Sequence, residues 1–387
     1  MREPELRSRL LREPVPGEPE AGERSWPVIR AAFAGRERKP WLERHTRAVL
    51  AVAAAAALAI AAVTPPGRAL VERVREVAGV SPSEPALVRL PAPGRLLVES
   101  ERGPWVVRQD GSKRRLGAYE EASWSRPRGL FVVATSGRRL VALEPDGDVR
   151  WTVTRPGRLD DPRWAPSGFR IAYREGESLR VVVGDGTSDH AFARAVAPVA
   201  PAWQPDQLRN ALAYLDRSGT LHVVDVDSRT ELWKASFPGD AARLAWSPDG
   251  SRLLALSADG TARLYDSSGR ETGGLEDATG AAFAPTGGLL AYTTYEPRSD
   301  TATVWLADSG RPRMLFAGAG RFQDLVWSPD GRWLLVTWPG PDQWLFFRTP
   351  TVRGPVSVSN ITEEFDPGTT GAGTFPRVSG WAPAPSG

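Results

Sequence analysis

The chain has 387 residues, of which 41% are hydrophobic, so it is long enough to bury one large core or several small ones. Its 49 basic and 46 acidic residues leave a formal net charge of only +3, which gives little reason to expect a nucleic-acid partner. The sequence contains no cysteine, and this excludes disulfides, thiolate catalysis, cysteine-based metal sites and a lipid-modified cysteine anchor.

Residues 1–47 form a polar, charge-mixed segment. They offer little apolar surface to offset the entropy lost on ordering, so we expect a cytoplasmic tail that is largely disordered or forms short helices. Leu6, Leu10 and Leu11 could line one such helix. The alternative interpretation is therefore a small docking segment for a cytoplasmic partner.

Residues 48–64 follow as an apolar segment, in which Ala48–Val63 is a run of 16 residues without a polar side chain. A membrane-spanning helix needs about 17–25 residues, and the charge-free stretch from Ala48 to Gly67 is long enough. The sequence thus predicts a single transmembrane helix. A cleaved signal-peptide core and a soluble alanine-rich helix are the alternatives.

The charges beside this segment predict its orientation. Basic residues are more numerous before it than after it, which places the N-terminus in the cytoplasm and the rest of the chain outside. They are Arg36, Arg38, Lys39, Arg44 and Arg47 before the segment, and Arg68, Arg73 and Arg75 after it. Residues 65–85 then begin with two prolines and are predicted to form a stalk.

The remaining chain, residues 86–387, is built on a repeat that is clearest at Leu244–Leu256 and Leu325–Val336. Ser247-Pro-Asp-Gly250 has the residues of a type I turn, with proline second and glycine fourth. The apolar residues on both sides of the turn predict two short strands. Because one hairpin cannot bury its own faces, other units must pack beside it.

An aromatic residue marks the same position in successive units, at intervals of 40, 39, 43, 37 and 44 residues. A period near forty with several short strands is typical of a β-propeller blade. The positions are Trp124, Trp164, Trp203, Trp246, Phe283 and Trp327. Each unit also contains a pair of apolar strands, and seven pairs are present. The sequence therefore predicts an all-β fold with a seven-bladed propeller, with six or eight blades as alternatives.

The seven pairs begin at Arg95–Ser100 with Trp105–Gln109, and continue with Leu130–Thr135 and Leu140–Glu144, Arg170–Tyr173 and Leu179–Val183, Ala211–Leu215 and Leu221–Val226, Leu253–Ser257 and Ala262–Asp266, Leu289–Tyr295 and Thr303–Ala307, and Trp333–Trp338 and Gln343–Arg348.

Closure of the ring requires a strand from one end of the domain to pair at the other end, since open edges invite aggregation. Val378–Pro383 carries one more copy of the first strand of the unit. We expect this C-terminal strand to join the first blade, and Ala86–Leu90 is the competitor for that place.

The unit Trp246-Ser-Pro-Asp-Gly250 followed by Ala262–Asp266 resembles the WD40-like repeat, also called PD40, of TolB-type β-propellers. The resemblance covers residues 86–387 and implies the fold. It says little about function, because propellers host many unrelated activities. TolB-type proteins also have a separate N-terminal domain that has no counterpart in this sequence.

Fifteen tryptophans are present, and most lie in strands or at the repeat position. We interpret them as large apolar side chains that pack between neighbouring blades. The stretches ending at Trp151 and Trp233 also resemble the tryptophan-docking repeats of quinoprotein-type propellers. They lack accompanying cofactor residues, so no cofactor is predicted.

Residues that could carry chemistry are sparse. Ser188, Asp189 and His190 are adjacent, and adjacent residues cannot adopt the geometry of a catalytic triad. No nucleophile elbow of the hydrolase type is present. We therefore predict no catalytic residues and no metal site.

One positional set suggests a binding site. Three residues before each repeat aromatic, the chain enters the innermost strand of a blade, close to the mouth of the central channel. Polar members of this set are Glu121, Asp161, Arg243 and Asp324. Three acids and one arginine around a ring could bind a cation or a basic peptide, and solvated strand-entry residues are the alternative.

These observations favour a non-enzymatic binding platform, anchored in the membrane and displayed in a bacterial cell envelope, for a protein, peptide or envelope polymer. Two other classes of function stay open. The first is a transmembrane signalling regulator with the propeller as its sensor, because the layout of tail, helix and sensor is similar to that of membrane-bound anti-sigma factors, although their zinc-binding motif is missing. The second is a glycan-active enzyme that uses the propeller channel.

Overall fold

The computed structural model describes residues 89–384 except 126–127, 207–208, 287, 309–311, 350–353 and 369–373. The predicted tail, spanning helix and stalk, residues 1–47, 48–64 and 65–85, lie outside the described residues. Among the residues that are described, no helix is long and apolar enough to cross a bilayer.

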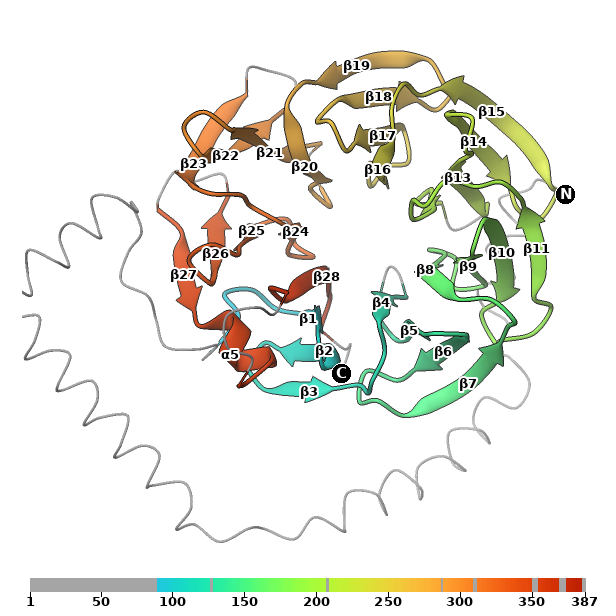
Figure 1. Ribbon diagram of the computed structural model, residues 1–387, viewed down its shortest axis with the longest axis horizontal. Coiled ribbons are helices and arrows are strands. Elements are labelled where there is room, and N and C mark those ends of the chain that lie inside the picture. The colour runs from blue at the N-terminus through green and yellow to red at the C-terminus, as the bar shows by residue number, and fades with distance from the viewer. Residues whose placement is uncertain are drawn as a thin grey trace, which may run out of the picture. The chain divides into compact units, whose positions relative to one another are not determined.

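Seven four-stranded antiparallel sheets make up the described part of the chain, and they follow one another around a ring (Figure 1). The fold is a seven-bladed β-propeller, as the repeat predicts. In each sheet the first strand given below is the innermost one and the last lies at the rim.

Blade 1 consists of β28 (Arg377–Ala382), β1 (Arg95–Ser100), β2 (Gly103–Arg108) and β3 (Lys113–Arg115). Blade 2 consists of β4 (Glu121–Trp124), β5 (Val132–Ser136), β6 (Arg139–Leu143) and β7 (Val149–Thr154). Blade 3 consists of β8 (Leu159–Trp164), β9 (Arg170–Glu175), β10 (Ser178–Val183) and β11 (His190–Ala193). Blade 4 consists of β12 (Ala202–Trp203), β13 (Ala211–Leu215), β14 (Thr220–Asp225) and β15 (Thr230–Ser236).

Blade 5 consists of β16 (Ala241–Trp246), β17 (Arg252–Ser257), β18 (Ala262–Asp266) and β19 (Glu271–Leu275). Blade 6 consists of β20 (Ala278–Phe283), β21 (Leu290–Glu296), β22 (Thr301–Ala307) and β23 (Arg313–Ala319). Blade 7 consists of β24 (Leu325–Trp327), β25 (Trp333–Trp338), β26 (Gln343–Arg348) and β27 (Val356–Ser359), and the short helix α5 (Ile361–Phe365) follows it. The seven predicted strand pairs match the second and third strands of the blades, with ends that differ by up to 2 residues.

The C-terminal strand closes the ring, which confirms the predicted latch. Strand β28 pairs with β1, and the register sets Arg377 opposite Glu99 and Ala382 opposite Arg95. In Figure 1 the red strand β28 lies beside the cyan strand β1. The competitor segment around Leu90 is not a strand where it is described, and Leu90 is buried instead. Blade 1 is thus assembled from both ends of the domain.

The repeat turns have the predicted geometry. In Ser247-Pro-Asp-Gly250 the Gly250 N–H donates to the carbonyl of Ser247 at 2.9 Å, as in a four-residue turn. Gly250 has φ +69°, a left-handed conformation that glycine adopts without steric cost. The Asp249 carboxylate accepts hydrogen bonds from the hydroxyls of Ser247 and Ser251, which fixes the turn.

Seven clusters of buried apolar side chains form the core, and each lies between two neighbouring blades. The tryptophans contribute as predicted. The indole N–H groups of Trp203, Trp246 and Trp327 each donate to a carbonyl of the preceding blade at 2.9–3.1 Å. Trp151 donates to the carbonyl of Gly184 in the next blade at 3.0 Å. These side chains therefore fasten one blade to the next.

Candidate functional site

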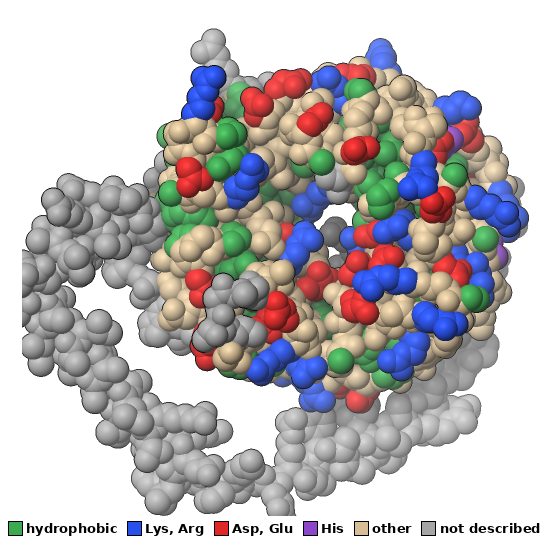
Figure 2. All heavy atoms as spheres, viewed as in Figure 1, with side chains coloured by type: hydrophobic (Ala, Val, Ile, Leu, Met, Phe, Trp, Pro, Cys, Tyr) green, Lys and Arg blue, Asp and Glu red, His purple; other side chains and the backbone are tan. Residues whose placement is uncertain are grey.

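The candidate site lies at the end of the propeller where the innermost strands begin, and we call this end the channel-mouth face. Acidic and basic side chains gather beside the central opening (Figure 2). Of the four residues predicted from the sequence, Asp324 directly precedes β24, Glu121 begins β4, and Asp161 and Arg243 lie in β8 and β16.

Asp324 joins blade 7 to blade 1. The residue is 5% exposed, and its carboxylate accepts the main-chain N–H of Val378 at 2.9 Å. The same carboxylate accepts from Arg377 Nη2 at 3.1 Å, and this arginine is itself 64% exposed. Asp324 thus holds the first residues of the closing strand β28.

Glu99 makes the equivalent contact at the next blade junction, although it is not among the residues predicted from the sequence. It lies on β1, directly opposite Arg377, and its carboxylate accepts the main-chain N–H of Ala122 in blade 2 at 2.8 Å. Because its side chain is partly buried, the hydrogen bond is shielded from competing water.

Glu121 makes the equivalent carboxylate contact between blades 2 and 3. Its carboxylate accepts the main-chain N–H of Asp161 at 2.6 Å. Asp161 lies at a bulge of β8 with φ +54°, and its own carboxylate accepts from Arg174 Nε at 2.6 Å. Three successive blade junctions are therefore bridged by a carboxylate that accepts an N–H from the innermost strand of the next blade.

Arg243 lies apart from this group. Its strand β16 belongs to blade 5, three blades from both blade 1 and blade 2 around the ring. The structure consequently brings together Glu121 and Asp161, and connects Asp324 to them through Arg377 and Glu99. Arg243 lies on a different part of the ring from Glu121.

Two carboxyls in this cluster, those of Glu99 and Glu121, hold their protons more tightly than usual. Burial raises the pKa of Glu99 to about 7, although the Ala122 N–H, Arg163 and Arg377 act in the opposite direction. Burial and the neighbouring charge of Asp161 raise the pKa of Glu121. Arg377 has a raised pKa because Asp324, Glu99 and Glu121 all lie close to it.

Sequence reasoning missed Glu99, Arg163, Arg174 and Arg377 for a common reason. The predicted set occupies one position, three residues before each repeat aromatic, and none of these four residues lies there. One signal was available: Glu99 directly follows the apolar run Leu96-Leu97-Val98 in a predicted strand, and a charge there suggests a specific partner.

The raised pKa of Glu99 predicts a measurable pH dependence of stability. An acid whose pKa is higher in the folded chain stabilises the fold at low pH, and this contribution is lost as the pH rises through 7. We expect Glu99→Gln to match the wild type near pH 5 and to exceed it at pH 8 by up to about 3 kcal/mol in unfolding free energy. Thermal melting of the full chain between pH 5 and 8 measures this difference.

The matched control is Glu276→Gln, because the side chain of Glu276 is 71% exposed. Its stability relative to the wild type should not change with pH in the same way. A Glu99→Gln variant that is less stable than the wild type at pH 8 would show that the ionised carboxylate stabilises the fold.

A cavity of about 580 Å³ lies beside the cluster on the channel-mouth face, formed by loops of blades 6 and 7. The guanidinium of Arg321 lies 3.8 Å from the ring centroid of Tyr295, whose hydroxyl donates to Asp300 at 2.8 Å. The lining residues are Tyr295, Asp300, Arg321, Phe322, Gln323, Pro339 and Gly340. Gln323 directly precedes Asp324, so the cavity adjoins the bridged junctions.

Comparisons with known proteins agree with this fold. Residues 235–266, from the end of β15 through β18, match the family described as WD domain, G-beta repeat. The molecule is therefore a seven-bladed β-propeller with WD40-like repeats. A search of curated protein sequences gave no match.

Two solved structures illustrate the structural similarity. A chain from the crystal structure of the mitotic checkpoint complex is 15% identical, with a TM-score of 0.53 over 70% of this chain and 96% of its own. KlHsv2, with its loop 6CD replaced by a Gly-Ser linker, is 13% identical, with a TM-score of 0.50 over 66% of this chain and 89% of its own. At such identities the similarity concerns the fold alone.

Proposed function

We propose that the protein is a non-enzymatic propeller of the TolB-like type that binds a protein or peptide partner through its channel-mouth face. WD40-like propellers are suited to protein binding because their rigid rings present loops from several blades on one surface. We propose further that the propeller is anchored by residues 48–64 and displayed outside the cytoplasm.

The observation that carries the proposal is a chemical difference between two neighbouring parts of this face, the carboxylates at the blade junctions and the cavity of blades 6 and 7. The carboxylates of Glu99, Glu121 and Asp324 accept main-chain N–H groups at blade junctions, which is a structural use. The adjoining cavity instead presents the exposed side chain of Arg321 over Tyr295. Tyrosine and arginine are the residue types that protein interfaces favour, since both combine apolar area with hydrogen-bonding groups.

The anchor is supported by the sequence of residues 48–64, which is apolar and has more basic residues before it than after it. With this orientation we propose that the channel-mouth face lies in the cell envelope. The expected partner is therefore an envelope protein or peptide with acidic groups for Arg321 and an apolar or aromatic group for Tyr295.

One experiment tests binding and location together, because the chain has no natural cysteine. Gly340 lines the cavity, and a Cβ added there would meet no atom within 4 Å, so Gly340→Cys should fold normally. A membrane-impermeant, thiol-reactive photo-crosslinker is added to intact cells. We expect Gly340→Cys to be labelled from outside and to capture a specific partner.

Two control variants accompany this experiment. Ser267→Cys, in an exposed turn of blade 5, should be labelled equally well but should not capture the same partner. Adding Arg321→Ala to Gly340→Cys should reduce capture severalfold without reducing labelling. Labelling only after permeabilisation would refute the extracytoplasmic location, and equal capture by the two cysteine variants would refute the binding face.

A further inference from the structure

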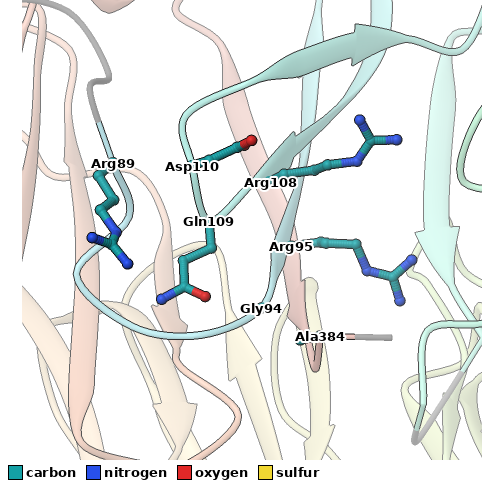
Figure 3. Close-up of a pocket in the computed structure, with 7 residues that line it drawn as sticks. All are labelled: Arg89, Gly94, Arg95, Arg108, Gln109, Asp110 and Ala384. Atoms are coloured by element: carbon teal, nitrogen blue, oxygen red, sulfur yellow. The ribbon is translucent and has the colours of Figure 1, made fainter. Parts of the chain in front are cut away.

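A second cavity, of about 430 Å³, lies at the opposite end of blade 1 from Glu99. It is formed where β1 begins, where β2 ends and where the chain leaves β28. Figure 3 shows Arg95 and Arg108 extending side by side in the same direction from neighbouring strands. The lining residues are Arg89, Gly94, Arg95, Arg108, Gln109, Asp110 and Ala384.

Arg95 is a buried cation without an acidic partner among the described residues. Its side chain is 6% exposed, and its guanidinium donates to the carbonyls of Pro383 and Gly129 at 3.3 and 2.8 Å. It also lies 5.1 Å from the ring centroid of Trp124. Carbonyl groups and a ring face stabilise the charge only in part, and a buried charge without a counter-ion is costly.

A second guanidinium adds to this charge instead of balancing it. Arg108 pairs with Arg95 across the β1–β2 ladder, and like charges in opposite positions of a ladder are unfavourable. Burial and the charge of Arg108 together lower the pKa of Arg95. Within the described residues, the exposed side chains of Arg89 and Arg108 make no ion pair or hydrogen bond.

Asp110 is the carboxylate that lines this cavity, and it is already engaged. Its Oδ1 accepts the main-chain N–H and the hydroxyl of Ser112 at 3.0 and 2.6 Å, within the turn that follows β2. Three arginines against one aspartate leave the lining with a net charge of +2. The amide of Gln109 supplies a further hydrogen-bonding group.

From this arrangement we propose that the blade 1 cavity binds a phosphate-bearing anion, with Arg95 and Arg108 as its main ligands. A phosphate monoester carries a charge of about −1.5 to −2 near neutral pH and has three strong acceptor oxygens. This matches the lining better than a carboxylate, which has one charge and two oxygens. Guanidinium groups bind phosphate in a bidentate manner, so two adjacent arginines can hold one phosphate.

The test titrates inorganic phosphate into the full chain and follows binding by calorimetry and by the shift in melting temperature. Sodium chloride at matched ionic strength and sodium acetate serve as reference salts. Arg108→Gln is the informative variant, because Arg95 also holds the closing strand and its loss could unfold the domain. Arg114→Gln, on the exposed rim strand of the same blade, is the matched control with the same change in charge.

We expect saturable phosphate binding by the wild type and by Arg114→Gln, and binding at least about tenfold weaker by Arg108→Gln. Without phosphate, Arg108→Gln should melt no lower than Arg114→Gln, because it removes a like-charge contact. Titration with glycerol 3-phosphate distinguishes the two possible natural ligands, a phosphate ester and free phosphate. Tighter binding than inorganic phosphate indicates a phosphate ester such as a lipid headgroup, and equal binding indicates free phosphate.

Three results would overturn the proposal. They are a wild type whose response to phosphate equals its response to chloride, an Arg108→Gln variant that binds as tightly as Arg114→Gln, and acetate binding at least as tight as phosphate binding.

Discussion

Deletion of residues 375–387 should abolish the cooperative unfolding transition of the propeller. The deletion removes β28, which is the innermost strand of blade 1 and the only contact that joins the C-terminal end of the described chain to its beginning through a sheet. Val378, Trp381 and Ala382 are 3%, 8% and 4% exposed, so their partners in blades 1, 2 and 7 would be opened to water.

The loss extends beyond this buried apolar surface. Without β28, the strand β1 becomes an open edge, and Asp324 loses the Val378 N–H and the Arg377 guanidinium. Loss of Trp381 alone is expected to cost about 3–5 kcal/mol, which is comparable to a large fraction of the stability of an ordinary domain. A chain without the whole strand should therefore expose its core and aggregate.

Thermal unfolding of the full chain and of the deleted chain measures this effect. Deletion of residues 385–387 alone is the control, because it leaves β28 complete. A peptide with the sequence of residues 375–387, added in excess, should restore the transition if the strand acts by pairing with β1. A deleted chain that melts like the full chain would show that another segment closes the ring.

The sequence predicts this fold well because the information is local and repeated. The Ser-Pro-Asp-Gly turn at 247–250 and the apolar strand after it recur at intervals near forty residues, and each copy reinforces the assignment of the others. The weak copies become interpretable once the period is known. Trp203, for example, lacks most of the motif but makes the same contact to the preceding blade as Trp246.

The candidate site was predictable only in part, because it depends on contacts between distant segments. The positional rule found Glu121, Asp161 and Asp324, which share one place on the innermost strands. It could not find Glu99, whose importance comes from its pairing with Arg377 across 278 residues of sequence. Nor could it show that these carboxylates accept main-chain N–H groups, since that depends on the register of each blade against the next.

Asp324 provides the test that separates a structural role from a binding role. We expect Asp324→Ala to reduce the unfolding free energy by about 3 kcal/mol, because it leaves the buried N–H of Val378 without an acceptor and removes a charge-assisted hydrogen bond. Asp324→Asn retains an acceptor and should lose less. Chemical denaturation of the full chain at pH 5.5, where Glu99 is mostly protonated, measures the effect apart from that group.

Arg377→Ala is the decisive comparison, because Arg377 shares the ion pair but not the hydrogen bond to Val378. Its side chain is 64% exposed, and exposed ion pairs contribute only about 0–1 kcal/mol. If the carboxylate acts by bridging blades 7 and 1, Asp324→Ala must cost several times more than Arg377→Ala. Equal costs would assign its effect to the ion pair. A stable Asp324→Ala chain that loses its partner would instead make Asp324 a binding residue, as its position at the channel mouth first indicated.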